Sequence, residues 1–435
     1  MKKTPNAILK KTISLILILS AISYSSWFLI NKHNKYLFRE TFVKELNKKV
    51  FKSKIKKKPP TWMCEQIQEE FEPFVLNGIT SKTVEKTFKK IKKTSPGNVI
   101  RYRIINNELF RYFDDDETVS LKDSSLEKAI KTILYFEPIK DIDIIISHQD
   151  GIPIGRDPEG FYITEKKEMQ SPILCSAKKK NLPLVVLIPD WRSVSRWWLK
   201  EISSVLKATE KNNWESKKNY AFWRGSCTNG IRPKLCKMAL KYPNHLYAKI
   251  NSKVENEDLQ MQFEQEGIYC SKGWYPMEKV LENKYLPLMD GVMSAAPAFQ
   301  SRLLSNSLTL KQNYSGVQWF FKPLKPYVHY VPIKQDISDL IEKIEWAKKN
   351  DGLCKEISKN ATDFALNNLM FEDVYLYFYL VLKKYSSLSL INSEEIKKEI
   401  KNNSNWMNIQ KREKLKKNLL KSGFRKVCNR AEPDF

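Results

Sequence analysis

Two cations, a glycine and a serine gather at the end of one apolar segment of the chain. Residues 220–223, Tyr-Ala-Phe-Trp, are typical of a short buried strand, and Arg224, Gly225 and Ser226 follow directly. Arg232 comes after a small-residue turn. A strand that ends in Gly-Ser and then opens a helix presents unpaired backbone N–H groups to phosphate, and flanking arginines add charge-assisted contacts. The pattern indicates a phosphate cradle, although a strand end with solvated or carboxylate-paired arginines fits the same residues equally well.

An imidazole and a carboxylate follow a second apolar segment. Residues 141–147 alternate and then run through three isoleucines, which is typical of a central strand in a parallel sheet. His148 and Asp150 come at its carboxyl end, where ligand sites of open α/β sheets lie. A carboxylate there can take a proton from a hydroxyl nucleophile. An Asx turn is the alternative for Asp150, and a core or surface position is the alternative for His148.

Two further segments offer weaker candidates. Residues 182–190 are typical of another buried strand, and Trp191 and Trp197 follow it among arginines. That cluster fits an acceptor cleft or a tryptophan-rich packing corner. Residues 294–304 begin with small side chains and open a helix that carries Arg302, which indicates a second helix N-terminus able to face phosphate.

Positive charge is concentrated at the two ends of the chain. The 435 residues carry +26, but residues 1–60 hold 15 Lys/Arg against two acidic residues, and residues 393–435 hold 12 against six. The residues between them therefore carry only +7. Proteins that bind nucleic acid place basic patches on the folded domain itself, so we exclude that class for the body of this protein.

An uncharged run rich in Ile and Leu covers residues 12–30, with lysines on both sides. At about 1.5 Å per residue it is roughly 28 Å long, the thickness of one hydrocarbon core. We predict a retained single-pass membrane anchor at 12–30, between a basic N-terminus at 1–11 and a basic linker at 31–60. A cleaved signal peptide and an amphipathic surface helix are the alternatives. Charge on both flanks leaves the side of the membrane open, whether a bacterial inner membrane or a eukaryotic endomembrane.

Strands alternate with helices along the rest of the chain. We predict an α/β fold with two Rossmann-like domains at 61–205 and 206–390, the second with closing helices, and a basic helical tail at 391–435. The predicted elements are a strand pair at 98–113, a helix at 121–136 capped by Ser124 or Ser125, strands at 245–250, 284–291, 308–311 and 328–332, and helices at 336–350, 353–368 and 371–386.

Two such domains facing one another would bring Asp150 of the first opposite Arg224, Ser226 and Arg232 of the second. A proton acceptor that faces a diphosphate cradle is the arrangement for transferring a sugar from a nucleotide sugar to a hydroxyl. The first domain would then bind the acceptor and the second the nucleotide sugar. Cations and helix N-termini would stabilise the leaving diphosphate in place of a metal.

Several short motifs follow one another in one order between residues 61 and 388. They are Trp62-Met with Gln66-Ile67, Gly78-Ile-Thr80, Ala221-Phe-Trp-Arg-Gly-Ser226, Lys284-Tyr-Leu286 with Asp290-Gly291, Leu310-Lys-Gln312, Trp319-Phe-Phe with Leu324-Lys-Pro and His329-Tyr-Val-Pro332, and Ile341 to Asp351 around Trp346-Ala-Lys. In this order they resemble the Rumi-type protein O-glucosyltransferases. That family includes the capsule-associated glycosyltransferases and bacterial lipopolysaccharide glycosyltransferase-like members.

The resemblance implies a GT-B fold and an inverting, metal-independent mechanism with a UDP-sugar donor. It also implies roles for particular residues. The family's catalytic Asp falls on Asp150, its nucleotide-binding Ser and Arg fall on Ser226 and Arg232, and its Arg-Gly pair falls on Arg224 and Gly225. Its second nucleotide loop falls on Met293, Ser294, Ala295, Ala296, Pro297 and Ala298.

The chain departs from the family pattern at the end of that second loop. The family ends the loop with an arginine, whereas this chain has Ala298 after a one-residue shift. Arg302 lies one helical turn further on, and our hypothesis is that it supplies the missing charge. A charged hydrogen bond to phosphate contributes about 1.5–3 kcal/mol, so donor affinity depends on this substitution.

The expected function is transfer of glucose or xylose from a UDP-sugar to a hydroxyl of a protein, a surface glycan or a lipopolysaccharide. The expected partners are that donor, a protein or lipid-linked glycan acceptor, and a membrane through 12–30; no cofactor or metal is expected. Seven scattered cysteines without a C-x-x-C pair indicate neither a zinc site nor a disulfide framework. A catalytically weakened member that binds nucleotide or glycan as a scaffold is the alternative.

Overall fold

The structure is a computed structural model that describes residues 46–94, 99–113, 119–149, 155–156, 162–163, 171–180, 182, 184–251, 256–270, 275–294 and 298–409. The chain divides into two compact units, Met1–Val50 and Phe51–Phe435, and the second contains the fold described below. Asp150, the residues 295–297 and the predicted anchor at 12–30 lie outside the described residues. Within the described ranges, no helix combines the length and the apolar character that a bilayer crossing requires.

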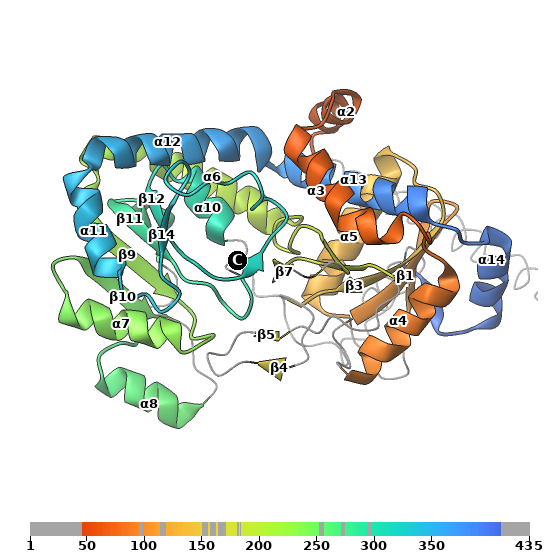
Figure 1. Cartoon of the computed structure of the whole chain (residues 1–435), viewed down its shortest axis with the longest axis horizontal. Coiled ribbons are helices and arrows are strands. Elements are labelled where there is room, and N and C mark those ends of the chain that lie inside the picture. Colours follow the sequence, from red (N-terminus) through yellow and green to blue (C-terminus); the bar gives the residue numbers. More distant parts are fainter. Residues whose placement is uncertain are drawn as a thin grey trace, which may run out of the picture. The chain divides into compact units, whose positions relative to one another are not determined.

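Two sheets organise the second unit (Figure 1). The first has the strand order β15-β2-β1-β3-β6-β8, and the second has the order β10-β9-β11-β12-β14. Helices lie between most of the strands in sequence, which confirms the predicted α/β class. We call the elements from α3 to α6, together with α13, α14 and β15, the first lobe, and the elements from η2 to α12 the second lobe.

The first lobe is built mainly from the segment that precedes residue 212. Its sheet is mixed: β1 pairs antiparallel with β2 and with β3, whereas β3, β6 and β8 are parallel. The elements are α3 (Thr61–Phe71), η1 (Glu72–Phe74), α4 (Ser81–Thr94), β1 (Val99–Ile105), β2 (Glu108–Tyr112), α5 (Leu121–Phe136), β3 (Ile142–Ser147), β4 (Gly155–Arg156), β5 (Tyr162–Ile163), β6 (Ile173–Cys175), β7 (Lys178–Lys179), β8 (Val185–Leu187) and α6 (Arg196–Lys211), after α2 (Lys48–Lys56), which crosses the boundary of the two units.

Only the β3-β6-β8 half of this sheet matches the Rossmann-like prediction. The antiparallel half starts from the hairpin β1–β2, whose two turn residues, Asn106 and Asn107, have φ angles of 49° and 63°. Asparagine tolerates this left-handed conformation, and two such residues in succession form the turn that suits the twist of a hairpin. Helix α5 has the predicted bounds, but its cap is Ser120, which exchanges hydrogen bonds with Asp123; the predicted caps Ser124 and Ser125 are wrong.

The second sheet is parallel throughout. Numbered along the chain, its strands run in the order 2-1-3-4-5, as in doubly wound nucleotide-binding folds. The elements of the second lobe are η2 (Trp214–Ser216), β9 (Lys218–Gly225), α7 (Ile231–Lys241), β10 (Leu246–Ile250), α8 (Glu257–Gln265), α9 (Met277–Val280), β11 (Asn283–Leu288), α10 (Ala298–Leu304), β12 (Leu308–Gln312), β13 (Gly316–Val317), β14 (Val331–Ile333), α11 (Leu340–Lys349) and α12 (Asp351–Asn368).

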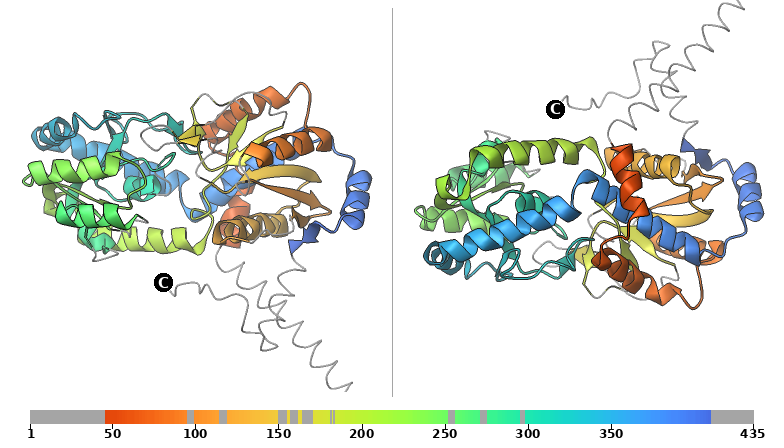
Figure 2. Two further views of the ribbon diagram at one scale, coloured as in Figure 1. Left: turned by 90° about the horizontal axis from the view of Figure 1, so that it is seen from below. Right: turned by 90° about the horizontal axis from the view of Figure 1, so that it is seen from above.

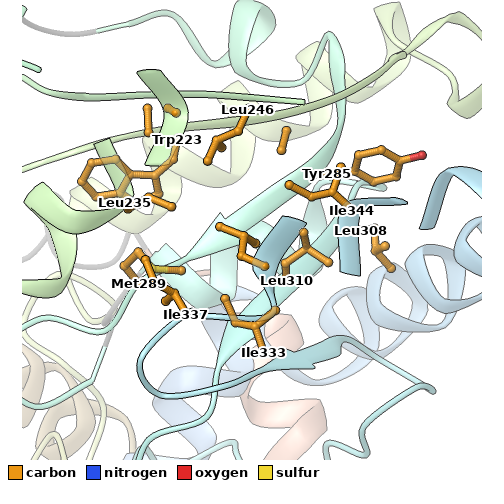
Figure 3. Close-up of a cluster of buried hydrophobic side chains, with 14 of the residues drawn as sticks. Trp223, Leu235, Leu246, Tyr285, Met289, Leu308, Leu310, Ile333, Ile337 and Ile344 are labelled. Carbon is orange, nitrogen blue, oxygen red and sulfur yellow. The ribbon is translucent and has the colours of Figure 1, made fainter. Parts of the chain in front are cut away.

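Alternate residues of these strands form one buried core (Figure 3). Trp223 of β9 and Leu310 of β12 pack there with Leu235 of α7 and Ile344 of α11. Burial of a Leu or Ile side chain contributes about 1.5–3 kcal/mol, so this cluster fixes the strand order and with it the position of every strand end.

The C-terminal segments return to the first lobe. Helix α13 (Phe371–Leu388) packs beside α3, as Figure 2 shows, and Tyr385 Oη donates to the carbonyl of Asp143 on β3 at 2.7 Å. After α14 (Ser393–Asn402), β15 (Trp406–Asn408) pairs antiparallel with β2. The segment predicted as a helical tail therefore adds an edge strand to the first sheet, and α13 does not belong with 206–390.

The C-terminal segment packs against a buried ion cluster on strands β1 and β3. Arg101 Nε and Nη2 donate to the two carboxylate oxygens of Asp143 at 2.9 and 2.7 Å, and Arg103 Nε donates to the same carboxylate at 3.0 Å. All three side chains are buried. The ring of Trp406 lies over the guanidinium of Arg103 at 4.2 Å, and Glu399 of α14 accepts from Arg103 Nη2 at 2.6 Å. The tail thus covers charges that the strands alone leave at the sheet surface.

Asp143→Asn tests the importance of this cluster. The amide carries no charge to balance the two buried guanidinium groups, and breaking a buried ion pair costs about 3–5 kcal/mol. We expect a drop of that size in the free energy of unfolding, measured by urea denaturation. Asp363→Asn, which removes an exposed partner of Lys359, is the control and should leave the urea midpoint unchanged. Equal midpoints for both variants would contradict the assignment.

Candidate active site

The loops that follow β9 and β11 lie together at the carboxyl edge of the second sheet. Strand β9 has β10 on one side and β11 on the other, so the winding of the sheet reverses between β9 and β11. Ligands of doubly wound folds bind outside the carboxyl ends of the strands at this switch point. Ser226 is the first residue after β9, and residues 289–294 follow β11.

The side chain of Arg232, on the first turn of α7, joins these two loops. Its Nη1 donates to the carbonyl of Ser226 at 2.9 Å, its Nη2 to that of Met289 at 3.1 Å, and its Nε to that of Asp290 at 3.2 Å. The guanidinium fork is rigid and always charged, so it sets the spacing of the loops and places a positive charge between them.

A second connection reinforces the first. Asn229 Nδ2 donates to the carbonyls of Asp290 and Gly291 at 3.0 and 2.9 Å. A Cβ atom at Gly291 would lie 3.4 Å from Arg232 Nη2, an ordinary van der Waals contact. Thr228 Oγ1 is buried nearby and has no hydrogen-bond partner among the described residues. Sequence reasoning assigned no role to Thr228, although its hydroxyl is a donor that a phosphate oxygen can satisfy.

At the end of β9, Ser226 is exposed, whereas Gly225 lies against a core side chain. Ser226 is exposed, and its hydroxyl has no partner in the part of the chain that the structure describes. A Cβ atom at Gly225 would lie 2.6 Å from the ring of Trp223, so only glycine fits between the strand end and the core. Burial raises the pKa of the neighbouring Cys227 thiol, against the opposing charge of Arg232.

The side chain of Arg224 does not join these two loops. Its Nη2 donates to Tyr247 Oη at 2.6 Å, and its guanidinium lies 5.3 Å from the ring of Tyr247 and 4.4 Å from that of Tyr275. Alternate strand residues face opposite sides of a sheet, so Arg224 shares the face of Phe222, which stacks on both tyrosines, while Trp223 enters the core. The structure thus brings Ser226 and Arg232 together and holds Arg224 between two aromatic rings.

The second loop is described only at its two ends. Met293 is buried, and Ser294 Oγ accepts a hydrogen bond from Gln318 Nε2 at 3.0 Å. Ala298 begins α10, whereas Ala295, Ala296 and Pro297 lie outside the described residues. Arg302 occupies the last turn of α10, within electrostatic range of Glu201 on α6. Burial lowers the pKa of Arg302, and the charge of Glu201 opposes this effect. Its phosphate-binding role stays a prediction.

The first lobe contributes His148 and two half-buried tryptophans. His148 follows β3 directly, with Nδ1 2.8 Å from Asp123 Oδ1, whereas Asp150 is outside the described residues. Trp191 stacks on the guanidinium of Arg192 at 4.5 Å, and Trp197 lies in the first turn of α6. The adjacent Trp198 is buried, and its Nε1 donates to the carbonyl of Leu369 at 3.0 Å. Part of this cluster is therefore the packing corner that the sequence allowed.

Both lobes line a cavity of about 840 Å³. The sequence predicted two domains that face a cleft, but no described candidate residue lines this cavity. The lobes are joined beside it by the antiparallel pair of β7 and β13. In its wall, Lys178 Nζ lies 3.2 Å from the carboxylate of Glu70, and burial raises the pKa of Glu70 against the charge of Lys178. Further lining residues are Gln66, Lys180 and Leu187 of the first lobe, and Phe299, Lys311, Asn313, Tyr314, Gln318, Phe321 and Tyr330 of the second.

Comparison with known proteins places the chain in a family. The model of glycosyl transferase family 90 matches residues 56–433. The chain belongs to glycosyl transferase family 90. It is therefore a glycosyltransferase, and the resemblance seen in the sequence is confirmed.

Its relatives include several protein O-glucosyltransferases. Protein O-glucosyltransferase 1 of Rattus norvegicus is 27% identical over 341 residues, which cover 75% of this chain and 80% of the relative. Protein O-glucosyltransferase 3 of Homo sapiens is 33% identical over 174 residues, 40% of this chain and 33% of the relative. Among solved structures, Anabaena Alr3699/HepE in complex with UDP and glucose matches with 10% identity and a TM-score of 0.35, covering 50% of this chain and 64% of that one. A likeness this distant carries no weight here.

Metal ligands do not gather in the described part of this family 90 chain. No three His, Cys, Asp or Glu side chains there form a group that could hold a metal ion. Six cysteines lie in the described ranges, and all are free thiols. Metal independence stays a prediction.

Gly316→Ala tests whether the second loop and the lobe junction must fit closely. A Cβ atom at Gly316 would lie 2.7 Å from the carbonyl oxygen of Met293, so one of the two backbones must move. We expect at least a tenfold loss of sugar transfer with little change in melting temperature.

Gly352→Ala on α12 is the control, because a Cβ atom there meets nothing within 4 Å. It should transfer sugar at the rate of the parent protein. Equal transfer rates in the two variants would show that the close approach at Gly316 is unimportant.

Proposed function

We propose that this protein is an inverting, metal-independent glycosyltransferase of the GT-B type that moves glucose or xylose from a UDP-sugar to a hydroxyl. The acceptor is a protein or a surface glycan such as lipopolysaccharide. The family, the names of the O-glucosyltransferase relatives and the two-lobed α/β architecture support this proposal. The observation that carries it is the switch point between β9 and β11, where Arg232 draws two loops around one positive charge.

The donor diphosphate would bind at these two loops. Ser226 and Thr228 offer hydroxyl donors, and Arg232 offers charge that is already held in place. The N-terminal ends of α7 and α10 would add backbone N–H groups, because the first turn of a helix leaves them without an intrahelical partner. These groups are already in place, so they would stabilise the charge that develops on the leaving diphosphate without reorganising. Such electrostatic stabilisation is the largest contribution to the rate enhancement of many enzymes.

The acceptor would be activated from the first lobe. We propose that the carboxylate of Asp150 takes the proton of the acceptor hydroxyl while the oxygen attacks the anomeric carbon. The bond from that carbon to the diphosphate breaks, and UDP leaves with the electron pair. Attack opposite to the leaving group inverts the configuration at the anomeric carbon. We also propose residues 12–30 as a membrane anchor, on the sequence pattern alone.

Asp150→Asn tests the base. An amide cannot take the proton, and general base catalysis contributes about 10²–10⁴-fold, so turnover should fall by at least about 100-fold while UDP affinity is unchanged. UDP release is measured with UDP-glucose and UDP-xylose as donors. Asp141→Asn, near the opposite end of β3, is the matched control and should keep full turnover. Equal slow turnover in the parent and in Asp150→Asn would favour a nucleotide- or glycan-binding scaffold instead.

Arg232→Lys tests the donor site. Lysine keeps the charge but carries all its donors on one nitrogen, so it cannot reproduce the wide, rigid fork that spans carbonyls of both loops, and the loops lose their fixed spacing. We expect UDP affinity, measured by calorimetry, to fall about tenfold or more. Lys234→Arg on the same helix, whose Nζ bonds the carbonyl of Asp336, is the control and should bind UDP normally. Unchanged affinity in Arg232→Lys would remove Arg232 from the donor site.

A further inference from the structure

The cavity that both lobes line lies directly against the second loop of the candidate donor site. Gln318, one of its lining residues, donates from Nε2 to Ser294 Oγ at 3.0 Å. Gly316, another lining residue, approaches the same loop so closely that a Cβ atom would lie 2.7 Å from the carbonyl oxygen of Met293. A molecule in the cavity would therefore lie next to residues that contact the proposed donor loop.

Most of the charged side chains that line the cavity are paired with one another or with a neighbouring carboxylate. The pairs are Lys178 with Glu70, with Nζ 3.2 Å from Oε1, Lys311 with Asp290, with Nζ 3.8 Å from Oδ2, and Lys322 with Glu69. Lys180, which is exposed, is the remaining charged residue of the lining. Charges that offset one another attract a polyphosphate only weakly, so the cavity does not suit a second nucleotide.

Aromatic rings and amide side chains make up much of the remaining lining. Tyr314, Phe321 and Tyr330 are half-buried, and Asn313 is exposed. Gln66, on α3 of the first lobe, is 5% exposed, and its Oε1 has no hydrogen-bond partner among the described residues. The cavity thus offers flat apolar surfaces together with neutral hydrogen-bonding groups.

Such a combination fits a sugar. The apolar C–H face of a sugar ring packs on an aromatic ring, and its hydroxyl groups donate and accept the hydrogen bonds that amides and carboxylates form. A hydroxyl group would also supply the donor that Gln66 Oε1 lacks. At about 840 Å³ the cavity lies within the range of about 300–1,000 Å³ that is typical of small-molecule sites, so it can hold a short oligosaccharide.

We propose that this cavity binds an uncharged sugar unit of the acceptor, so that the acceptor is a glycan and not a bare polypeptide. The rings of Phe321 and Tyr330 pack on the faces of the sugar, and Asn313 and Gln66 bond its hydroxyl groups. The bound unit holds the acceptor beside the second loop and undergoes no bond change itself. This inference rests on the proposed function and narrows its acceptor to one chemical class.

Two arrays test the acceptor class, one of uncharged and acidic oligosaccharides and one of unglycosylated polypeptides. With the full chain and radiolabelled UDP-glucose or UDP-xylose, we expect label on uncharged oligosaccharides, at a rate that does not fall at high salt. Label confined to polypeptides or to acidic oligosaccharides would overturn the inference, and so would UDP release without label on either array. No UDP release under any condition would instead refute the proposed function on which the inference rests.

Asn313→Ala and Tyr330→Ala test the cavity itself. Each variant loses one hydrogen-bonding group or one ring that contacts the sugar, so KM for the best glycan of the array should rise about fivefold or more. KM for the donor should stay at the parent value, because neither side chain belongs to the loops around Arg232. If Tyr330→Ala does not fold, Tyr330→Leu is measured in its place.

The matched control is Asn367→Ala. Asn367 is an exposed asparagine of α12 whose Nδ2 donates to the carbonyl of Asp363, and it does not line the cavity. This variant should keep the parent KM for both the glycan and the donor. A parent-like KM for the glycan in both Asn313→Ala and the Tyr330 variant would overturn the inference.

Discussion

One guanidinium group holds together the backbone of the candidate donor site. The carbonyl oxygens of Ser226, Met289 and Asp290 all point toward Arg232, and without a cation between them these dipoles would repel one another. A hydrogen bond to a charged group contributes about 1.5–3 kcal/mol, so three of them suffice to hold two loops that have few buried apolar residues of their own. The same charge makes the switch point attractive to an anion. The structural role and the proposed ligand-binding role therefore fall on one side chain.

The position of the first lobe beside this site depends on contacts that lie far apart in the sequence. Strands β7 and β13 pair across the junction, and the N–H of Lys180 donates to the carbonyl of Ser315 at 2.9 Å. Ser193 Oγ donates to Gln300 Oε1 of α10 at 2.5 Å. Helix α13 then returns to the first lobe. Such links join the two lobes beside a cavity that both of them line.

The sequence predicted the second lobe better than the first for a physical reason. Strands of a parallel sheet are buried on both faces, so each appears as a continuous apolar run with a polar turn after it. Ser226 and Arg232 could be placed on that basis. The face of Arg224 could have been read from its alternation with Phe222, and the Ser120 cap from its spacing to Asp123.

Other features left no local signal. Strand β15 has three residues, and its partner β2 lies about three hundred positions earlier in the chain. The contact of His148 with Asp123 joins a strand end to a helix start, and the cavity forms only where the two lobes meet. Neither follows from the spacing of residues in one segment, because both depend on how the elements pack.

Hydrogen–deuterium exchange with and without UDP tests the central claim most directly. The account predicts that UDP slows exchange in peptides that cover 225–232 and 289–298, and leaves peptides at the amino edge of the second sheet, around 243–246, unchanged. Protection confined to other parts of the chain, or no protection at either loop at saturating UDP, would contradict a donor site at the switch point between β9 and β11.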